Sequence, residues 1–340
     1  MTSPHGSPSI TLASSVSSAA TASQAATASS AATASSAATG APSPSTVPPL
    51  ATRGVGGTVV AESLPEALET AFAVVTRLGD PFVLMGVLGL LYVVAPVSGA
   101  DRSRIACVVA VGLGALTLTF TLKSAAALPR PPGAVEEGFG FPSGHALGST
   151  AVYGAAAALF PWGRRRFRIA TAGVGVAAVS LSRVALGVHF LVDIVAGAAV
   201  GGALLAVALR IGPGVAPETV DPADADRMFD LAAILALGGL TAGVAGLGAG
   251  VTVDDAFGLG AAGGAWGAWR FGGRRVVDAV VDRTGTAVAA VGLLVILVGL
   301  SVLTDATPSP PAVAVGAGAL VAGLLALPWL GAAASGRGAR

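Results

Sequence analysis

The sequence predicts an all-α membrane protein, a polytopic transmembrane helical bundle of about nine spans. Of its 340 residues, 54% are hydrophobic and only 11% are charged, whereas a soluble domain carries about 25% charged residues. Apolar runs recur from residue 81 onward, and most approach the ~20 residues that a helix needs to cross ~30 Å of hydrocarbon. The 48 glycines fit this class, because small residues let helices approach closely within a membrane.

The N-terminal residues 1–57 are expected to form a disordered tail. Residues 1–50 are rich in Ala, Ser and Thr and contain no Lys, Arg, Asp or Glu. Such a segment cannot bury a core, and it lacks the basic and apolar regions of a signal peptide. Two explanations stay open, a start codon assigned too early and an exposed, glycosylated tail.

Residues 58–79 predict an interfacial helix instead of a spanning one. Glu62, Glu66 and Glu69 share one face at positions i, i+4 and i+7, opposite an apolar face. Three acids in so short a segment argue against a membrane crossing and favour a helix lying in the interface. The segment Gly79-Asp80-Pro81 ends this helix and starts the next.

Nine apolar runs follow and divide the rest of the chain into three parts. The runs cover residues 81–98, 105–124, 145–162, 169–188, 190–210, 231–252, 255–270, 286–304 and 311–333. We expect a membrane core at 58–211, an acidic cytoplasmic linker at 212–230 and a C-terminal transmembrane region at 231–340. The last region carries no motif of its own.

The distribution of positive charge predicts the orientation. Placing the N-terminus outside and the C-terminus inside puts fourteen of the nineteen Lys and Arg residues in interior loops, as the positive-inside rule requires. The short run 255–270 must then cross, because four of these arginines would otherwise face outward. This topology places the loop 125–144 and the junction 188–190 together on the external face of the cell membrane.

Composition also limits the partners. A net charge of +1 provides no broad basic surface, so we expect no nucleic-acid partner. The single cysteine, Cys107, excludes an intrachain disulfide and a cysteine-based metal site. We expect it to be a packing residue, and we expect no metal and no cofactor. The oligomeric state stays open.

Three clusters between Lys123 and Asp193 hold the only lysine and two of the three histidines. They read Lys123-(six residues)-Arg130-Pro131, Pro142-Ser143-Gly144-His145 and Ser182-Arg183-(five residues)-His189-(three residues)-Asp193. A single His or Arg at the end of a span is usually an interfacial residue. Ionisable residues at membrane depth are costly, however, and tend to be functional. Three clusters at the ends of spans on one face therefore favour a site.

These side chains suit phosphoryl transfer, which needs charge neutralisation, an in-line nucleophile and a proton for the leaving oxygen. We expect Lys123, Arg130 and Arg183 to bind the phosphoryl oxygens. Ser143 and Gly144 precede a predicted helix, and its first amides would donate to the same anion.

The two histidines are expected to have different roles. His189 and Asp193 are spaced i, i+4 and share a helix face. A carboxylate there fixes the tautomer of the imidazole and stabilises its charged form. This predicts His189 as the nucleophile that forms a phosphohistidine, and leaves His145 as the general acid. Glu136 and Glu137, in the intervening loop, are interpreted as ordinary polar loop residues, with repelling excess anions or lining the entry to the site as the alternatives.

The three clusters resemble the signature of the type-2 phosphatidate phosphatase superfamily, the membrane lipid phosphate phosphatases. Every signature position is filled, directly over residues 123–193 and over about 58–211 with the flanking helices. The resemblance implies a metal-independent hydrolase with a helical core and gives the eight residues the same roles. The chain departs from the family at its ends, since residues 58–79 replace the usual first span and residues 228–340 have no counterpart in the signature.

We therefore expect a phosphatase that hydrolyses lipid phosphate or diphosphate esters at the extracytoplasmic face, with a membrane lipid phosphate as its partner in the bilayer. A phosphotransferase that uses the same phosphohistidine is one alternative. A non-catalytic lipid transporter or scaffold is another, although a binder would need only the cations and not the intact set of His145, His189 and Asp193. Prenyl phosphates or diphosphates, phosphatidate and phosphatidylglycerophosphate all remain candidate substrates.

Overall fold

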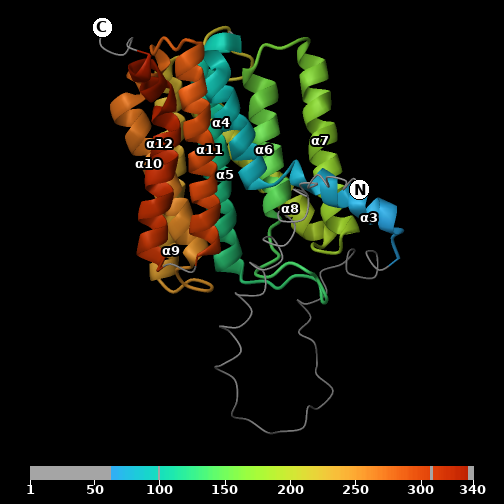
Figure 1. The fold of residues 1–340 in the computed structure, drawn as a ribbon. Helices are drawn as coiled ribbons and strands as arrows, with labels where there is room; N and C mark the ends of the chain where they lie inside the picture. Colours follow the sequence, from blue (N-terminus) through green and yellow to red (C-terminus); the bar gives the residue numbers. More distant parts are fainter. Residues whose placement is uncertain (1–62, 99, 307–308, 336–340) are drawn as a thin grey trace, which may run out of the picture. The chain divides into compact units, whose positions relative to one another are not determined.

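The computed structural model describes residues 63–98, 100–306 and 309–335. The regular secondary structure of these residues is entirely helical. Their ten helices (Figure 1) are α3 (Glu66–Arg77), α4 (Pro81–Ser98), α5 (Arg102–Ala126), α6 (Gly144–Leu159), α7 (Arg165–Ala185), α8 (Leu191–Ile211), α9 (Pro222–Val244), α10 (Val253–Val277), α11 (Arg283–Asp305) and α12 (Pro310–Ala334). The predicted tail at 1–57 and the start of the interfacial segment at 58–62 lie outside the described residues.

Helix α5 is central to the arrangement. It contacts α4, α6, α8, α9 and α10, and most of its residues are buried on every side, as expected for a helix that is apolar all round. Asp101 caps its N-terminus by accepting a 2.8 Å hydrogen bond from the amide of Ser103. Its C-terminus is capped by Ala127, which has a left-handed conformation and whose amide donates a hydrogen bond to the carbonyl of Lys123. This cap fixes Lys123 in the last turn.

Helices α6 and α8 pack against α5, and α7 packs against α6 and α3 (Figure 1). Glycines on α8 allow its backbone to approach α6. A Cβ atom on Gly197 would lie 2.5 Å from the carbonyl oxygen of Ser143, and one on Gly201 would clash with the carbonyl of Leu147. This is the small-residue packing expected between membrane helices. It brings the N-terminus of α6 against the N-terminus of α8.

Helices α9 to α12, coloured orange to red in Figure 1, lie beside α4 and α5. Helix α10 contacts α5, α9 and α12, while α11 and α12 both contact α4. Gly260 and Gly264 of α10 sit against the backbone of α12. The C-terminal region therefore packs directly against two helices that also reach the predicted site.

The number of spans differs from the prediction. Each of the nine predicted runs overlaps one helix, from α4 to α12. By length and composition, however, six described helices can cross a membrane, namely α5, α7, α8, α9, α11 and α12. A seventh span results if α3 and α4 form one bent element, with a 49° bend between them. The predicted count of nine is not confirmed, since α6 has only 16 residues and the glycine-rich α10 is not among the helices that are apolar enough to cross.

The predicted linker at 212–230 is also partly wrong, because α9 begins at Pro222. Asp221 and Asp224 form a capping box in which the carboxylate of Asp224 accepts from the amide of Asp221 at 3.0 Å. The acids that suggested a solvated linker instead start a helix.

Several arginines bind helix ends on the side of the bundle away from the predicted site. Arg102 donates to the carbonyls of Val276 and Ala279 at 2.8 and 2.7 Å. Arg168 donates from Nε to the carbonyl of Ala157 at 3.0 Å. These contacts satisfy carbonyls at the C-terminal ends of α10 and α6, which have no partner within their own helix. The interior arginines of the topology prediction thus include residues that join helix ends.

Candidate active site

Five of the eight predicted site residues line one pocket, with a volume of about 160 Å³. We call it the polar pocket. Lys123 comes from the last turn of α5, Arg130 from the loop that follows, Gly144 and His145 from the first turn of α6, and His189 from the α7–α8 junction. Residues from all three motifs therefore meet at one end of the helices.

His189 is held between a carboxylate and a guanidinium. Its Nδ1 atom lies 3.5 Å from Oδ2 of Asp193, and both side chains are fully buried. Its Nε2 atom lies 3.1 Å from Nη1 of Arg130. Because arginine can only donate, Nε2 is the acceptor and the ring proton resides on Nδ1, facing Asp193. The Nε2 lone pair therefore faces Arg130, which lines the polar pocket together with His189.

Burial lowers the pKa of His189 to about 4, although the interaction with Asp193 opposes this shift. The imidazole is consequently neutral near pH 7 and keeps its lone pair. Asp193 is itself fixed by its place in the first turn of α8, where Oδ2 accepts from the amide of Phe190 at 3.0 Å. A neutral imidazole with an oriented tautomer is the state that a nucleophile requires.

Glu136 occupies the space between the two predicted phosphate-binding arginines. Nη2 of Arg183 lies 2.5 Å from each of its carboxylate oxygens, and Nη1 of Arg130 lies 3.1 Å from Oε2. Burial alone would raise the pKa of Glu136, but Arg183 and Arg130 outweigh it and hold the pKa at about 2. The interpretation of Glu136 as an ordinary loop residue is therefore wrong. The only signal for its role in the sequence was its position as an acid in the loop that also carries Arg130.

Arg183 is 2% exposed and still has a free donor. Its Nη1 donates to Oγ1 of Thr76 at 3.0 Å, whereas its Nε is buried and has no hydrogen-bond partner among the described residues. A buried donor without a partner is unfavourable. The site formed by Arg130 and Arg183 therefore has one N–H donor left, Nε of Arg183, for an anion with more oxygens than a carboxylate.

Ser143 and Gly144 position the start of α6. The hydroxyl of Ser143 accepts from the amide of Ala146 at 3.5 Å, and its own amide donates to the carbonyl of Asp193 at 3.0 Å. Ser143 is fully buried and is not among the residues that line the polar pocket. A Cβ atom on Gly144 would lie 2.8 Å from Cγ2 of Thr119. Glycine at this position therefore lets α6 start directly against α5.

A sequence model of the PAP2 superfamily matches residues 104–215. This segment belongs to the PAP2 superfamily. The PAP2 segment contains all eight predicted site residues and helices α6, α7 and α8. Together with the apolar helices, it makes this a membrane protein of the phosphatase type, and it confirms the family that the motifs predicted. No curated protein and no solved structure matched the chain.

Residues outside the PAP2 segment complete the pocket, and sequence reasoning missed them. Thr76 of α3 binds Arg183, and Gly79 and Pro81 at the α3–α4 junction line the polar pocket. A Cβ atom on Gly79 would lie 3.2 Å from Cδ2 of His145 and would clash with Val179. Because these contacts depend on how α3 folds back over α7, no local sequence pattern reveals them.

Proposed function

We propose that this protein hydrolyses the phosphate or diphosphate ester of a membrane lipid through a phosphohistidine formed on His189. The observation that carries the proposal is the orientation of His189. Its Nε2 lone pair faces a pocket that also holds Lys123 and Arg130, while its Nδ1 faces the buried carboxylate of Asp193. That arrangement supports nucleophilic catalysis more directly than simple anion binding.

In the first step, the substrate phosphoryl group replaces the carboxylate of Glu136 between Arg130 and Arg183. The Nε2 lone pair of His189 attacks phosphorus in line with the ester oxygen, and a P–N bond forms as the P–O bond breaks. His145 takes up a proton as the phosphate anion binds beside it, and it gives this proton to the departing lipid oxygen. The ionised Asp193 stabilises the positive charge that develops on the His189 ring.

In the second step, water attacks the phosphohistidine. Neutral His145 takes a proton from this water as its oxygen bonds to phosphorus. The P–N bond breaks and returns its electron pair to Nε2. Inorganic phosphate leaves, and Glu136 can again pair with the two arginines. The cations neutralise the phosphoryl oxygens in both steps.

The orientation of the protein follows from charge. Arg102, Arg104 and Arg168 lie at the helix ends away from the polar pocket. Cytoplasmic loops carry the excess of arginine in membrane proteins. We therefore assign the polar pocket to the extracytoplasmic face of the cell membrane and the C-terminus to the cytoplasm.

The test is phosphate release from a panel of lipid phosphates in detergent, with and without EDTA. Wild-type protein is compared with His189→Ala and with His5→Ala, which removes the histidine outside the motifs. We expect release by the wild type and by His5→Ala in the presence of EDTA, and none by His189→Ala. Activity that survives in His189→Ala contradicts the assignment of the nucleophile, and activity abolished by EDTA contradicts a metal-independent reaction.

A further inference from the structure

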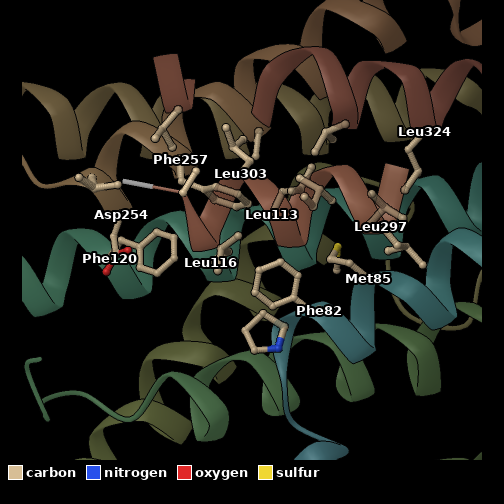
Figure 2. Close-up of a pocket in the computed structure, with 18 residues that line it drawn as sticks. Phe82, Met85, Leu113, Leu116, Phe120, Asp254, Phe257, Leu297, Leu303 and Leu324 are labelled. Carbon is tan, nitrogen blue, oxygen red and sulfur yellow. The ribbon is translucent and has the colours of Figure 1, made fainter. Parts of the chain in front are cut away.

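A second pocket, larger than the polar pocket, lies between the PAP2 segment and the C-terminal helices. Its volume is about 380 Å³, within the ~300–1,000 Å³ usual for small-molecule sites. Figure 2 shows its lining, to which α4, α5, α10, α11 and α12 contribute. Of its 18 lining residues, seventeen are apolar, and Asp254 at one end is the exception. We call it the apolar pocket.

The two pockets adjoin each other. Pro81, Met85, Leu116 and Phe120 line both of them. Met85 and Leu116 therefore form part of a shared boundary between α4 and α5. A molecule bound by its phosphate in the polar pocket can extend past this boundary into the apolar pocket without leaving the protein.

One face of α5 leads from the phosphate site into the apolar pocket. Phe120, Leu116, Leu113 and Val109 follow one another at spacings of four, three and four residues, so they form one stripe on the helix. Lys123 continues this stripe at the polar end. The fourteen steps along the helix from Val109 to Lys123 rise about 21 Å along the axis, roughly two thirds of a ~30 Å hydrocarbon core. The stripe has the length and chemistry of a path for a lipid chain.

The far wall of the apolar pocket is built by helices outside the PAP2 segment. Val313 and Val321 of α12 and Leu300 of α11 are buried there, whereas Phe82 and Val253 are 44% and 48% exposed. The pocket thus has a buried floor and an exposed apolar rim, through which a chain can pass from the bilayer. A pocket lined by seventeen apolar residues offers a hydrocarbon chain van der Waals contacts along its length, so it favours a long chain over a short one.

We infer that the apolar pocket binds the hydrocarbon chain of the lipid whose phosphate is bound between Lys123, Arg130 and Arg183. The substrate class is therefore a phosphate or diphosphate on a long hydrocarbon chain, and the C-terminal helices α10 to α12 select it. This inference rests on the proposed function, because it takes the polar pocket as the site of the phosphate.

The first test compares two substrates that differ only in chain length, hexadecyl phosphate and butyl phosphate. Leu297→Trp on α11 fills the apolar pocket, whereas Leu294→Trp makes the same change one turn away, at a side chain that is 62% exposed and outside the lining. We expect Leu297→Trp to lower the ratio of kcat/KM for hexadecyl over butyl phosphate at least about tenfold, and Leu294→Trp to leave it unchanged. An unchanged ratio in Leu297→Trp, whether both activities persist or both fall, overturns the inference.

The second test does not depend on turnover. A hexadecyl phosphonate with a diazirine at its chain end is photolysed with protein in phosphatidylcholine vesicles, and the labelled peptides are mapped. We expect labelling of α10, α11 or α12 residues of the apolar pocket, which excess hexadecyl phosphonate removes and Leu297→Trp reduces. Labelling elsewhere, or labelling that excess phosphonate does not remove, overturns the inference. If the wild type hydrolyses neither phosphate but the pocket is labelled, the proposed function fails while the chain site stands.

Discussion

The carboxylate of Glu136 lies 2.5 Å from Nη2 of Arg183. The same carboxylate also pairs with Arg130. One acid of the loop after α5 therefore neutralises both arginines that the proposed reaction uses to bind phosphate. In that proposal, a substrate anion replaces Glu136 before His189 reacts.

Removing the charge of Glu136 should strengthen anion binding. In Glu136→Gln, phosphate no longer competes with a carboxylate for Arg130 and Arg183. A charge-assisted hydrogen bond contributes about 1.5–3 kcal/mol, so we expect inorganic phosphate to inhibit the variant about tenfold more tightly than the wild type. The inhibition constant of phosphate is the measurement. Glu137→Gln is the matched control, because this neighbouring side chain is exposed and should leave the constant unchanged. Weaker inhibition in Glu136→Gln would contradict the exchange of carboxylate for phosphate.

The stability of the protein should depend on pH through His189. Burial lowers its pKa to about 4 in the folded protein, against about 6.5 in an unfolded chain. Between these values the unfolded chain binds a proton that the folded protein does not, so stability falls as the pH drops from about 6.5 to about 4. Glutamine does not titrate, so His189→Gln should lose less stability over the same pH range. Thermal unfolding of both proteins in detergent at several pH values checks this, and parallel curves would contradict the lowered pKa.

The close contact of α8 with α6 should be essential for the site. Gly197→Ala places a Cβ atom 2.5 Å from the carbonyl oxygen of Ser143. This position is next to the hydrogen bond that the amide of Ser143 donates to the carbonyl of Asp193. Overpacking of this kind costs about 1–3 kcal/mol, and we expect lower thermal stability together with lower activity. Gly202→Ala, on the same helix with nothing within 4 Å of its Cβ atom, should leave both unchanged or slightly raise stability. Equal behaviour of the two variants would show that the contact is not needed.

The assignment of faces can be tested with single cysteines. The native Cys107 is buried, so the wild type should not react with an impermeant maleimide in intact cells. We expect Glu137→Cys to be labelled in intact cells and Arg165→Cys only after permeabilisation, since both positions are exposed but lie at opposite ends of the bundle. Labelling of residue 165 from outside would reverse the orientation.

The candidate site residues of the PAP2 segment could be predicted because their residue types and spacing match the three motifs of the family. Lys123, His145 and His189 lie far apart along the chain, yet each stands at the end of an apolar run, and Arg130 lies in the loop that follows the first of these runs. The predicted pairing of His189 with Asp193 is present, but the reason given for it was wrong, because His189 precedes α8 (Leu191–Ile211) and does not share a helix face with Asp193. These features depend on local structure and on a signature that can be recognised in one sequence.

Other features depend on packing that no local pattern reports. Glu136 was misread because its partner Arg183 lies 47 residues away and reaches it only when α7 packs beside the loop. The apolar pocket is lined by Leu116 of α5 and Leu297 of α11, and both look like ordinary residues of a membrane helix. The start of α9 at Pro222 was missed because the capping acids resemble a solvated linker.

Covalent trapping tests the central claim most directly. The wild type is mixed with hexadecyl phosphate labelled at phosphorus, quenched in alkali to preserve phosphohistidine, and digested for peptide mapping. We predict label on His189 in the wild type and no covalent label in His189→Ala, with His5→Ala labelled like the wild type. Turnover without a covalent label, or label on a residue other than His189, would contradict the account.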